Sequence, residues 1–277
     1  MSGQKRSDTD EMTFAEHIDA LRPHLVRGVL AILALAVAAF HCKGLLDGVL
    51  FGPMSSGFPT NRLLVWMAGL AGIEFVPGIE RMQLINTAMA GQFNLHLKIS
   101  MVAAFCIGFP YLLWELWRFA RPALTERELR GCRRFVFYVS AGFFAGLLFG
   151  YFVIAPLTIG FLSQYSVSEQ VTNMIDVGSY LSTVLNVSIA CAVVFQLPLL
   201  VYFLTRMGLV SPDFLRRYRR HALVALAILS AVITPPDVFS MILVLLPLFG
   251  LYEYSIRISE RTLRRSSGTE GTTTEGK

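Results

Sequence analysis

Long apolar runs alternate along this chain with short stretches that are rich in lysine and arginine. Of the 24 basic residues, 20 fall in four hydrophilic stretches, whereas the stretch 163–180 contains none. The four are an N-terminal tail (Lys5, Arg6, Arg22, Arg27), a first hinge (Arg118, Arg121, Arg127, Arg130, Arg133, Arg134), a second hinge (Arg206, Arg216, Arg217, Arg219, Arg220) and a C-terminal tail (Arg257, Arg261, Arg264, Arg265, Lys277). This is the positive-inside pattern of a polytopic membrane protein, and it predicts that both termini are cytoplasmic.

The composition agrees with a membrane location. Apolar residues make up 54% of the chain and charged residues only 16%, which is too apolar for an ordinary soluble domain. A net charge of +5 would otherwise suggest a nucleic-acid partner, but the membrane topology already accounts for it. The four cysteines have no C-x-x-C spacing, so no disulfide framework is predicted.

Six apolar runs predict an all-α fold with six transmembrane helices. The expected spans are Leu25–Leu46, Ile99–Trp117, Phe135–Leu162, a segment within Val177–Thr205, Ala222–Thr234 and Val238–Tyr252. The last two hold 13 and 15 residues, whereas about 20 are needed to cross the hydrocarbon core. We therefore expect two short spanning helices around a tight outer turn at Pro235-Pro236.

The same pattern predicts three parts. A cytoplasmic N-terminal segment with an interfacial helix (1–24) precedes the six-span membrane domain (25–258), and a disordered cytoplasmic tail (259–277) follows it. An outer cap is expected at about 47–97, between the first two spans. It includes the uncharged run Leu63–Ile73, which has only 11 residues, and a crossing there would move the first hinge outside the cell.

No sequence motif indicates enzymatic chemistry. The chain contains no HExxH, GxSxG or GxxxxGK[ST] motif, and its five histidines lie near the ends of the expected spans. We therefore predict no catalytic residue, no metal site and no cofactor.

Polar residues in or beside apolar runs are candidates for function, because each costs free energy there. Gln196 could bond a neighbouring helix or the carbonyl of Val194, which Pro198 leaves without a donor, or it could contact a partner protein. Glu115, between two tryptophans, is interpreted as an acid that snorkels to the inner interface. Asp237 is positioned to cap the sixth helix.

Glu126 and Glu128 lie just inside the membrane, among the arginines of the first hinge. Either carboxylate could cap the third helix or offset the neighbouring positive charge. A carboxylate held at this interface could also bind a basic peptide, because arginine pairs with carboxylate through two hydrogen bonds.

Four motifs resemble those of the TatC family, the multi-spanning receptor subunit of the twin-arginine protein translocase. They are His17-Ile18-Asp19-Ala20-Leu21-Arg22, Trp117-Arg118-Phe119-Ala120-Arg121-Pro122-Ala123-Leu124 with Glu128, Phe195-Gln196-Leu197-Pro198 and Ile233-Thr234-Pro235-Pro236-Asp237-Val238-Phe239-Ser240. Together with the six-span plan, the resemblance extends from about Phe14 to Glu260.

The resemblance implies a function in protein export. Members of this family bind twin-arginine signal peptides of folded cargo at the cytoplasmic face of the bacterial inner membrane. They assemble with the single-span proteins TatA and TatB and use the proton-motive force. Glu128 matches the family's acidic signal-peptide contact, and Phe119 matches a residue beside it. Gln196, Pro53 and Asp237 match positions in the concave membrane face, the outer cap and the outer turn, where partner contacts are expected.

Two departures from the family pattern concern carboxylates. Ala20 stands where the family carries a second contact carboxylate, and Gln196 stands where many members carry Glu, which argues against a proton relay there. Pro23 could begin the first span afresh. The segment Phe14–Leu21 would then be a separate interfacial helix that presents Asp19 in place of the missing carboxylate. The alternative is that Glu128 alone recognises the peptide.

Two other function classes compete with this interpretation. A small-solute transporter or channel would show internal repeats and paired charges or broken helices at mid-membrane. Neither is visible in the sequence. A purely structural scaffold would not need Glu128 among arginines.

Overall fold

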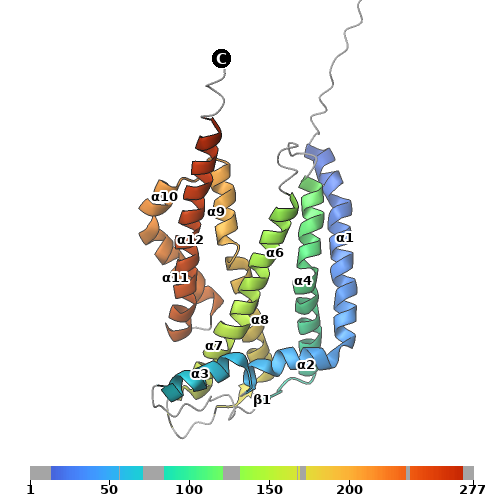
Figure 1. Ribbon diagram of the computed structural model, residues 1–277. Helices are drawn as coiled ribbons and strands as arrows, with labels where there is room; N and C mark the ends of the chain where they lie inside the picture. The colour runs from blue at the N-terminus through green and yellow to red at the C-terminus, as the bar shows by residue number, and fades with distance from the viewer. Residues whose placement is uncertain are drawn as a thin grey trace, which may run out of the picture. The chain divides into compact units, whose positions relative to one another are not determined.

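The computed structural model describes residues 14–55, 57–70, 84–120, 132–166, 168, 173–234 and 238–270 (Figure 1). These residues are mostly helical, as predicted, with one small parallel sheet of two strands, β1 and β2. The elements are α1 (Phe14–His41), α2 (Lys43–Phe51), the 3-10 helix η1 (Gly52–Met54), α3 (Pro59–Leu70), β1 (Leu84–Ile85), α4 (Gly91–Ala120), α6 (Cys132–Phe149), the π-helical turn η4 (Gly150–Ile154), α7 (Ala155–Gln164), β2 (Ile175–Asp176), α8 (Val177–Val194), α9 (Leu197–Arg206), α10 (Pro212–Arg217), α11 (Arg219–Ile233) and α12 (Val238–Glu270).

Five helical segments among the described residues are long and apolar enough to cross a membrane. They are Leu21–His41, Gly91–Phe119, Val136–Gln164, Val177–Arg206 and Ser240–Leu263. Each overlaps one of the six predicted spans. The remaining prediction falls on α11, whose 15 residues are fewer than the roughly 20 that a crossing usually needs. The sixth crossing therefore stays a prediction.

Several helix ends lie elsewhere than the hydropathy predicted. The expectation of a short last helix is wrong, because α12 continues for 33 residues to Glu270. The tail expected to be disordered from residue 259 is accordingly helical over its first part. Its apolar run ends at Tyr252, but the helix continues because Glu253 and Glu260 form ion pairs with Arg219 of α11 and Arg216 of α10. The first span ends at His41 rather than at Leu46.

The expected helix break at Pro23 is also wrong. Helix α1 runs through this proline without interruption, so Phe14–Leu21 is not a separate helix. A proline inside a helix removes one backbone hydrogen bond, here to the carbonyl of Asp19, and a helix can accommodate that loss by bending. On a continuous helix, the side chains of Asp19 and Ala20 point about 100° apart.

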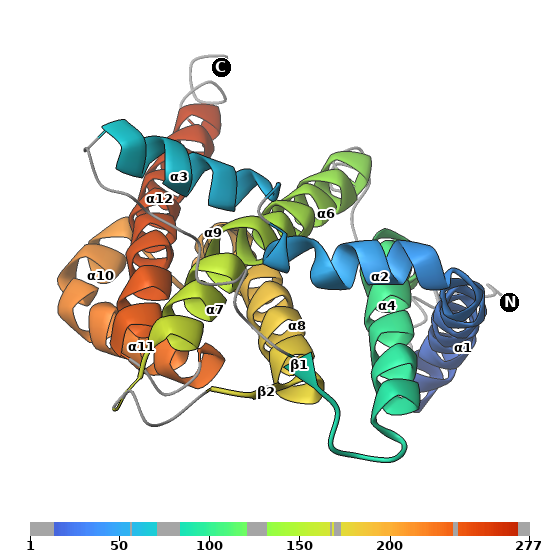
Figure 2. The same cartoon turned by 90° about the horizontal axis from the view of Figure 1, so that it is seen from below.

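The chain divides into two compact units, of which the first comprises residues 1–41 and 100–140. In this unit α1 lies beside α4 (Figure 2) and runs antiparallel to it (Figure 1). A methyl group at Gly28 would lie 2.8 Å from Leu112, and one at Gly108 would lie 3.2 Å from Ile32. The absence of side chains at these two positions therefore lets the helices approach closely.

The second unit comprises residues 42–99 and 141–277, and glycines line the consecutive elements α6 and η4. Gly142, Gly146 and Gly150 recur every four residues, and Gly146 and Gly150 face α8, whereas Gly142 faces the turn that follows it. A Cβ atom at Gly146 would lie 2.5 Å from the carbonyl oxygen of Cys191, and one at Gly150 would lie 2.7 Å from the Cα atom of Ser188. Small residues at this spacing are typical of close helix packing in membranes.

Helices α9, α11 and α12 complete the second unit, with α12 packed along both of the others (Figure 1). The buried core between them and α8 contains Ile154, Val187, Leu226, Val244 and Leu248. Towards the end of α9, a smaller cluster of Val201, Leu215 and Ile256 joins α9, α10 and α12.

The region predicted as a cap includes the end of α2, η1, α3 and β1, at the end of the second unit remote from α10 (Figure 1), but its last residues, 91–97, belong to α4. Side chains hold the cap to the spans by donating to backbone carbonyls. The hydroxyl of Thr60 donates to the carbonyl of Phe152, which Pro156 leaves without its usual helical donor. The Tyr180 hydroxyl donates to the Leu50 carbonyl at 2.9 Å.

Candidate functional site

The structure brings two of the predicted signal-peptide residues to the same end of the first unit. His24 of α1 pairs with Glu115 of α4, and Gly28 lies against Leu112. These contacts show that α1 and α4 run antiparallel. About one turn beyond the His24–Glu115 pair, the turn of α1 that contains Asp19 therefore lies beside the turn of α4 that contains Phe119. Asp19 is described by its backbone only, and the side chain of Phe119 is partly buried.

Two predicted site residues, Glu128 and Asp237, lie outside the described residues. The connection that contains Glu128 leaves α4 at Ala120 and re-enters the described chain at Cys132. Its starting point is therefore one residue beyond Phe119.

A buried ionisable cluster, which the sequence did not reveal, lies next to this end of the first unit. The side chain of Glu115 is only 3% exposed. Its Oε2 atom is 2.6 Å from Nδ1 of His24, and its Oε1 atom accepts hydrogen bonds from the Tyr111 hydroxyl at 3.1 Å and from Arg118 Nη1 at 3.4 Å. Glu115 thus does not snorkel as predicted. Three donors satisfy its carboxylate inside the protein, as a buried charge requires.

This cluster connects segments that are far apart in the sequence. Tyr111, Glu115 and Arg118 lie on one face of α4, and His24 comes from α1, 91 residues before Glu115. The cluster joins the start of the first span to the end of the second. It therefore fixes the position of the α1 turn with Asp19 relative to Phe119.

Gln196 lies in the turn between α8 and α9, where its side chain is partly buried. Its Nε2 atom is 3.5 Å from the carbonyl oxygen of Ala192, one turn earlier, which is a long hydrogen bond. The amide also lies over Gly142 of α6. The acceptor of this bond is Ala192 rather than the predicted Val194. A contact between Gln196 and a partner protein stays a prediction.

Pro53 is buried within η1 and takes part in the internal bonding of the cap. Asn61, which is 1% exposed, donates from Nδ2 to the carbonyl oxygens of Pro53 and Ser55, at 3.1 Å and 2.9 Å. Pro53 therefore helps to shape the loop between α2 and α3.

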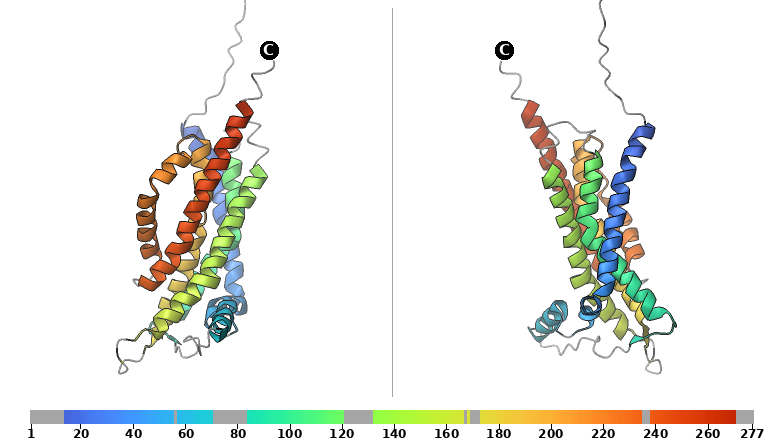
Figure 3. Two further views of the ribbon diagram at one scale, coloured as in Figure 1. Left: turned by 60° about the vertical axis from the view of Figure 1, so that its left-hand side comes forward. Right: turned by 90° about the vertical axis from the view of Figure 1, so that its right-hand side faces the viewer.

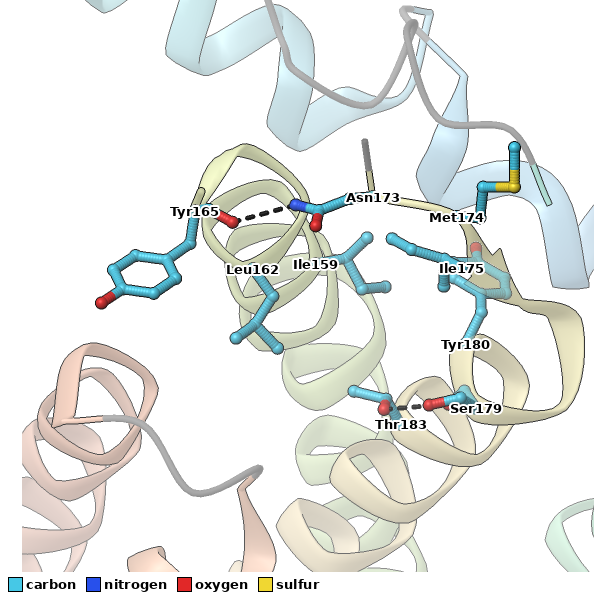
Figure 4. Close-up of a pocket in the computed structure, with 9 residues that line it drawn as sticks. All are labelled: Ile159, Leu162, Tyr165, Asn173, Met174, Ile175, Ser179, Tyr180 and Thr183. Carbon is cyan, nitrogen blue, oxygen red and sulfur yellow. Dashed lines mark hydrogen bonds between the residues drawn. The ribbon is translucent and has the colours of Figure 1, made fainter. Parts of the chain in front are cut away.

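A pocket of about 440 Å³ opens in the second unit between the end of α7 and the start of α8 (Figure 4). Ile159, Leu162 and Ile175 form its apolar wall. Asn173 donates to the carbonyl of Tyr165, and Thr183 donates to the carbonyl of Ser179. None of the described residues that line this pocket carries a carboxylate, imidazole, amine or thiol, so among them only hydroxyl groups could act as acid, base or nucleophile. Within the described ranges, no three His, Cys, Asp or Glu side chains are grouped to hold a metal ion.

Comparison with known proteins places the chain in a family. The sequence model of the family TatC, described as Sec-independent protein translocase protein, matches residues 16–247. The chain belongs to the TatC family. The resemblance that the four motifs indicated is thereby confirmed.

Individual TatC proteins are similar over nearly the whole length. The Sec-independent protein translocase protein TatC of Blattabacterium sp. subsp. Periplaneta americana is 35% identical over 258 residues, 92% of this chain and 97% of the relative. That of Deinococcus radiodurans is 37% identical over 247 residues, 88% of this chain and 84% of the relative. A crystal structure of the twin-arginine translocase receptor TatC superposes with a TM-score of 0.70 at 27% identity, covering 90% of this chain and all of that one.

These relatives, together with the apolar helices, make this TatC family member a multi-pass membrane protein. Two of its site features were not found from the sequence. The spacing of Gly142, Gly146 and Gly150 was a readable signal of helix packing. The pairing of His24 with Glu115 left no signal in the sequence, because it depends on which helices are neighbours.

Proposed function

We propose that this TatC family member is the receptor subunit of a twin-arginine protein translocase in the bacterial inner membrane. It binds the signal peptides of folded precursors at the cytoplasmic face and nucleates a translocation complex that the proton-motive force drives. Family membership supports this proposal, as do the relatives that are named Sec-independent protein translocase proteins.

The antiparallel pairing of α1 with α4 is the observation that carries the proposal. The turn with Asp19, the turn with Phe119 and the beginning of the connection with Glu128 all belong to one end of the first unit. An aromatic side chain close to a carboxylate suits an arginine side chain, which binds carboxylate bidentately and stacks on aromatic faces. The main arginine contact is assigned to Glu128, with Phe119 beside it.

Asp19 is a weaker candidate for the signal-peptide contact than the sequence suggested. Because α1 is continuous through Pro23, Asp19 points about 100° away from the direction of Ala20 and does not simply replace a carboxylate there. Its negative charge still attracts a basic peptide at longer range.

Six crossings with both termini in the cytoplasm complete the proposal. Within the second unit, the second-hinge arginines of α10 and α11 lie at the end remote from the cap (Figure 1), as the positive-inside rule requires. With its 15 residues, α11 would cross where the bilayer is thin. Cysteines introduced at Asn173 and Arg217 into a cysteine-free background should then react with an impermeant thiol reagent from opposite sides. Labelling from one side would contradict this topology.

The proposed partners are TatA-like and TatB-like single-span proteins, and further copies of this chain. Gln196, Asp237 and Pro53 are the candidate contact positions. Gln196 is neutral, so it would act as a hydrogen-bonding group and not as a proton carrier.

The decisive experiment removes the carboxylate of Glu128. A bidentate contact to arginine in a partly dry interface is worth roughly 1.5 to 3 kcal/mol, or about 10- to 150-fold in affinity. Glu128→Ala should weaken the binding of a twin-arginine precursor by that factor and stop export, while the protein still inserts into the membrane. Glu126→Ala is the matched control, because it removes an equivalent charge two residues away.

A precursor with two lysines in place of the arginines tests specificity. It should bind wild type poorly and should lose little further affinity in Glu128→Ala. Equal binding of the twin-arginine precursor by wild type and Glu128→Ala would show that this carboxylate is not the contact. Asp19→Lys should reduce binding less than Glu128→Ala does.

A further inference from the structure

Helix α12 presents a charged face to the junction of α10 and α11. This junction, residues 215–220, is called the elbow below. Glu253, Arg257 and Glu260 follow one another at spacings of four and three residues, so they share one side of the helix. Glu253 accepts a hydrogen bond from Arg219 Nη2 at 2.8 Å, and Glu260 accepts one from Arg216 Nη2. Arg257 lies between these two ion pairs along the helix.

Packing fixes the elbow against α12. Leu215 and Ile256 are 8% and 2% exposed and belong to the same buried cluster. The hydroxyl of Tyr252 donates to the Leu215 carbonyl at 2.8 Å. Figure 3 shows α10 and α11 beside α12. Arg216, Arg219 and Arg257, the arginine triad, are therefore attached to elements with a set relative position.

Positive charge exceeds negative charge around the triad. Helix α10, the start of α11 and this face of α12 contain five arginines (the triad with Arg217 and Arg220) against Asp213, Glu253 and Glu260, which leaves a net charge of +2. Arg257 has no acidic partner within the described residues. Arg216 and Arg219 each contact their glutamate through a single nitrogen atom, and their side chains are 54% and 47% exposed. Because a guanidinium group carries five N–H donors, most of their donors remain available to an anion.

The position of the triad along α12 indicates what that anion is. Arg257 comes 19 residues after Val238, the first residue of the helix, which is roughly 28 Å at 1.5 Å per residue. The hydrocarbon core of a bilayer is about 30 Å thick. A helix that begins at one surface therefore brings Arg257 to the headgroup layer of the other. The exposed Tyr218 and Tyr254 are typical of that layer.

We infer that the arginine triad binds the phosphodiester of an anionic phospholipid headgroup. The two glutamates orient Arg216 and Arg219, and Arg257 between them supplies the charge that no carboxylate of the described chain neutralises. Basic pockets between membrane helices bind acidic headgroups in this way. The inference is independent of signal-peptide binding, so it stands or falls separately from the proposed function.

The test measures binding of fluorescent phosphatidylglycerol to the purified full-length chain in nanodiscs of phosphatidylcholine. Arg257→Gln should weaken binding about tenfold, as expected for the loss of one hydrogen bond between charged groups. This residue is exposed and has no described protein partner, so the substitution leaves the fold intact. Arg62→Gln, an equal loss of charge in the cap of the same unit, should bind like wild type.

Three results would overturn the inference. The first is unchanged lipid binding by Arg257→Gln. The second is an equal loss in Arg62→Gln, which would show attraction by net charge alone. The third is displacement of the lipid by inorganic phosphate at millimolar concentration, which would make free phosphate the ligand. Arg257→Lys, which keeps the charge but has no planar fork, should bind with intermediate affinity if the guanidinium geometry contributes.

Discussion

Both units of this protein pack membrane helices at glycines, but the charged contacts between helices centre on a buried carboxylate in the first unit and on partly exposed side chains in the second. In the first unit, α1 and α4 are joined by an ionisable cluster around the buried carboxylate of Glu115. In the second unit, α6 and η4 meet α8 through glycines, and the cap is attached by side chains that donate to backbone carbonyls.

The difference follows from depth in the membrane. Glu115 lies five residues before the end of α4, where water and cationic side chains are close and a charge can be compensated. Gly146 lies within the apolar segment Val136–Gln164, where close packing costs no desolvation. The first unit should therefore be sensitive to a change of charge, and the second unit to a change of volume.

The largest effect is expected for the smallest substitution, Gly146→Ala. The added methyl group would lie 2.5 Å from the Cys191 carbonyl oxygen and 2.8 Å from the Ala192 Cα atom, both of them backbone atoms that cannot rotate away. We expect a loss of about 3 kcal/mol of stability, at the upper end for overpacking. Unfolding of the purified protein in detergent, followed by heat or by denaturant, measures it.

Gly250→Ala is the matched control for this prediction. Gly250 is also a helical glycine, but a Cβ atom there meets nothing within 4 Å. Alanine is favoured over glycine in a helix by roughly 0.5–1 kcal/mol, so this variant should be as stable as wild type or slightly more so. If both variants behave alike, volume does not limit the second unit.

An intermediate effect is expected for Glu115→Ala in the first unit. It removes the common acceptor of His24, Tyr111 and Arg118. Hydrogen bonds to a charged group contribute about 1.5–3 kcal/mol, and the exposed donors Tyr111 and Arg118 recover part of that loss by bonding water. The loss should loosen α1 from α4, which crosslinking between cysteines introduced at Gly28 and Leu112 would report.

Glu115→Gln separates charge from shape in the same cluster. It keeps one acceptor oxygen and nearly the same volume, so part of the crosslinking should return. Full crosslinking in Glu115→Ala would mean that packing alone holds α1 to α4, and the contrast between the two units would disappear.

Apolar periodicity and charge predicted the helical class and the approximate spans, because both follow from the cost of burying polar groups in lipid. Helix ends were predicted less well, since hydropathy marks the edge of the membrane and not the end of a helix. At Glu253 the apolar run stops, yet α12 continues, because its charges pair with Arg219 and Arg216 of the elbow. Such pairs between helices cannot be read from local sequence.

The candidate site shows the same limit. Asp19 and Phe119 were identified by their motifs, but the cluster that sets their relative position joins residues 91 apart in the chain. The predicted helix break at Pro23 was wrong for a related reason. Proline's local preference suggested a break, while the rest of α1 could keep its helical hydrogen bonds and its packing against α4.

The smallest effect on stability is expected for Gln196→Leu, which changes a polar contact of the second unit and not its packing volume. The amide of Gln196 donates a long hydrogen bond of 3.5 Å to the Ala192 carbonyl, and polar contacts of this kind in membranes average about 0.6 kcal/mol. Stability should therefore change little. If Gln196 also contacts a TatA-like or TatB-like helix, crosslinking to that partner should fall partially in Gln196→Leu and persist in Gln196→Glu, because glutamate keeps an acceptor there. Wild-type crosslinking by Gln196→Leu would restrict this residue to packing over Gly142 within its own unit.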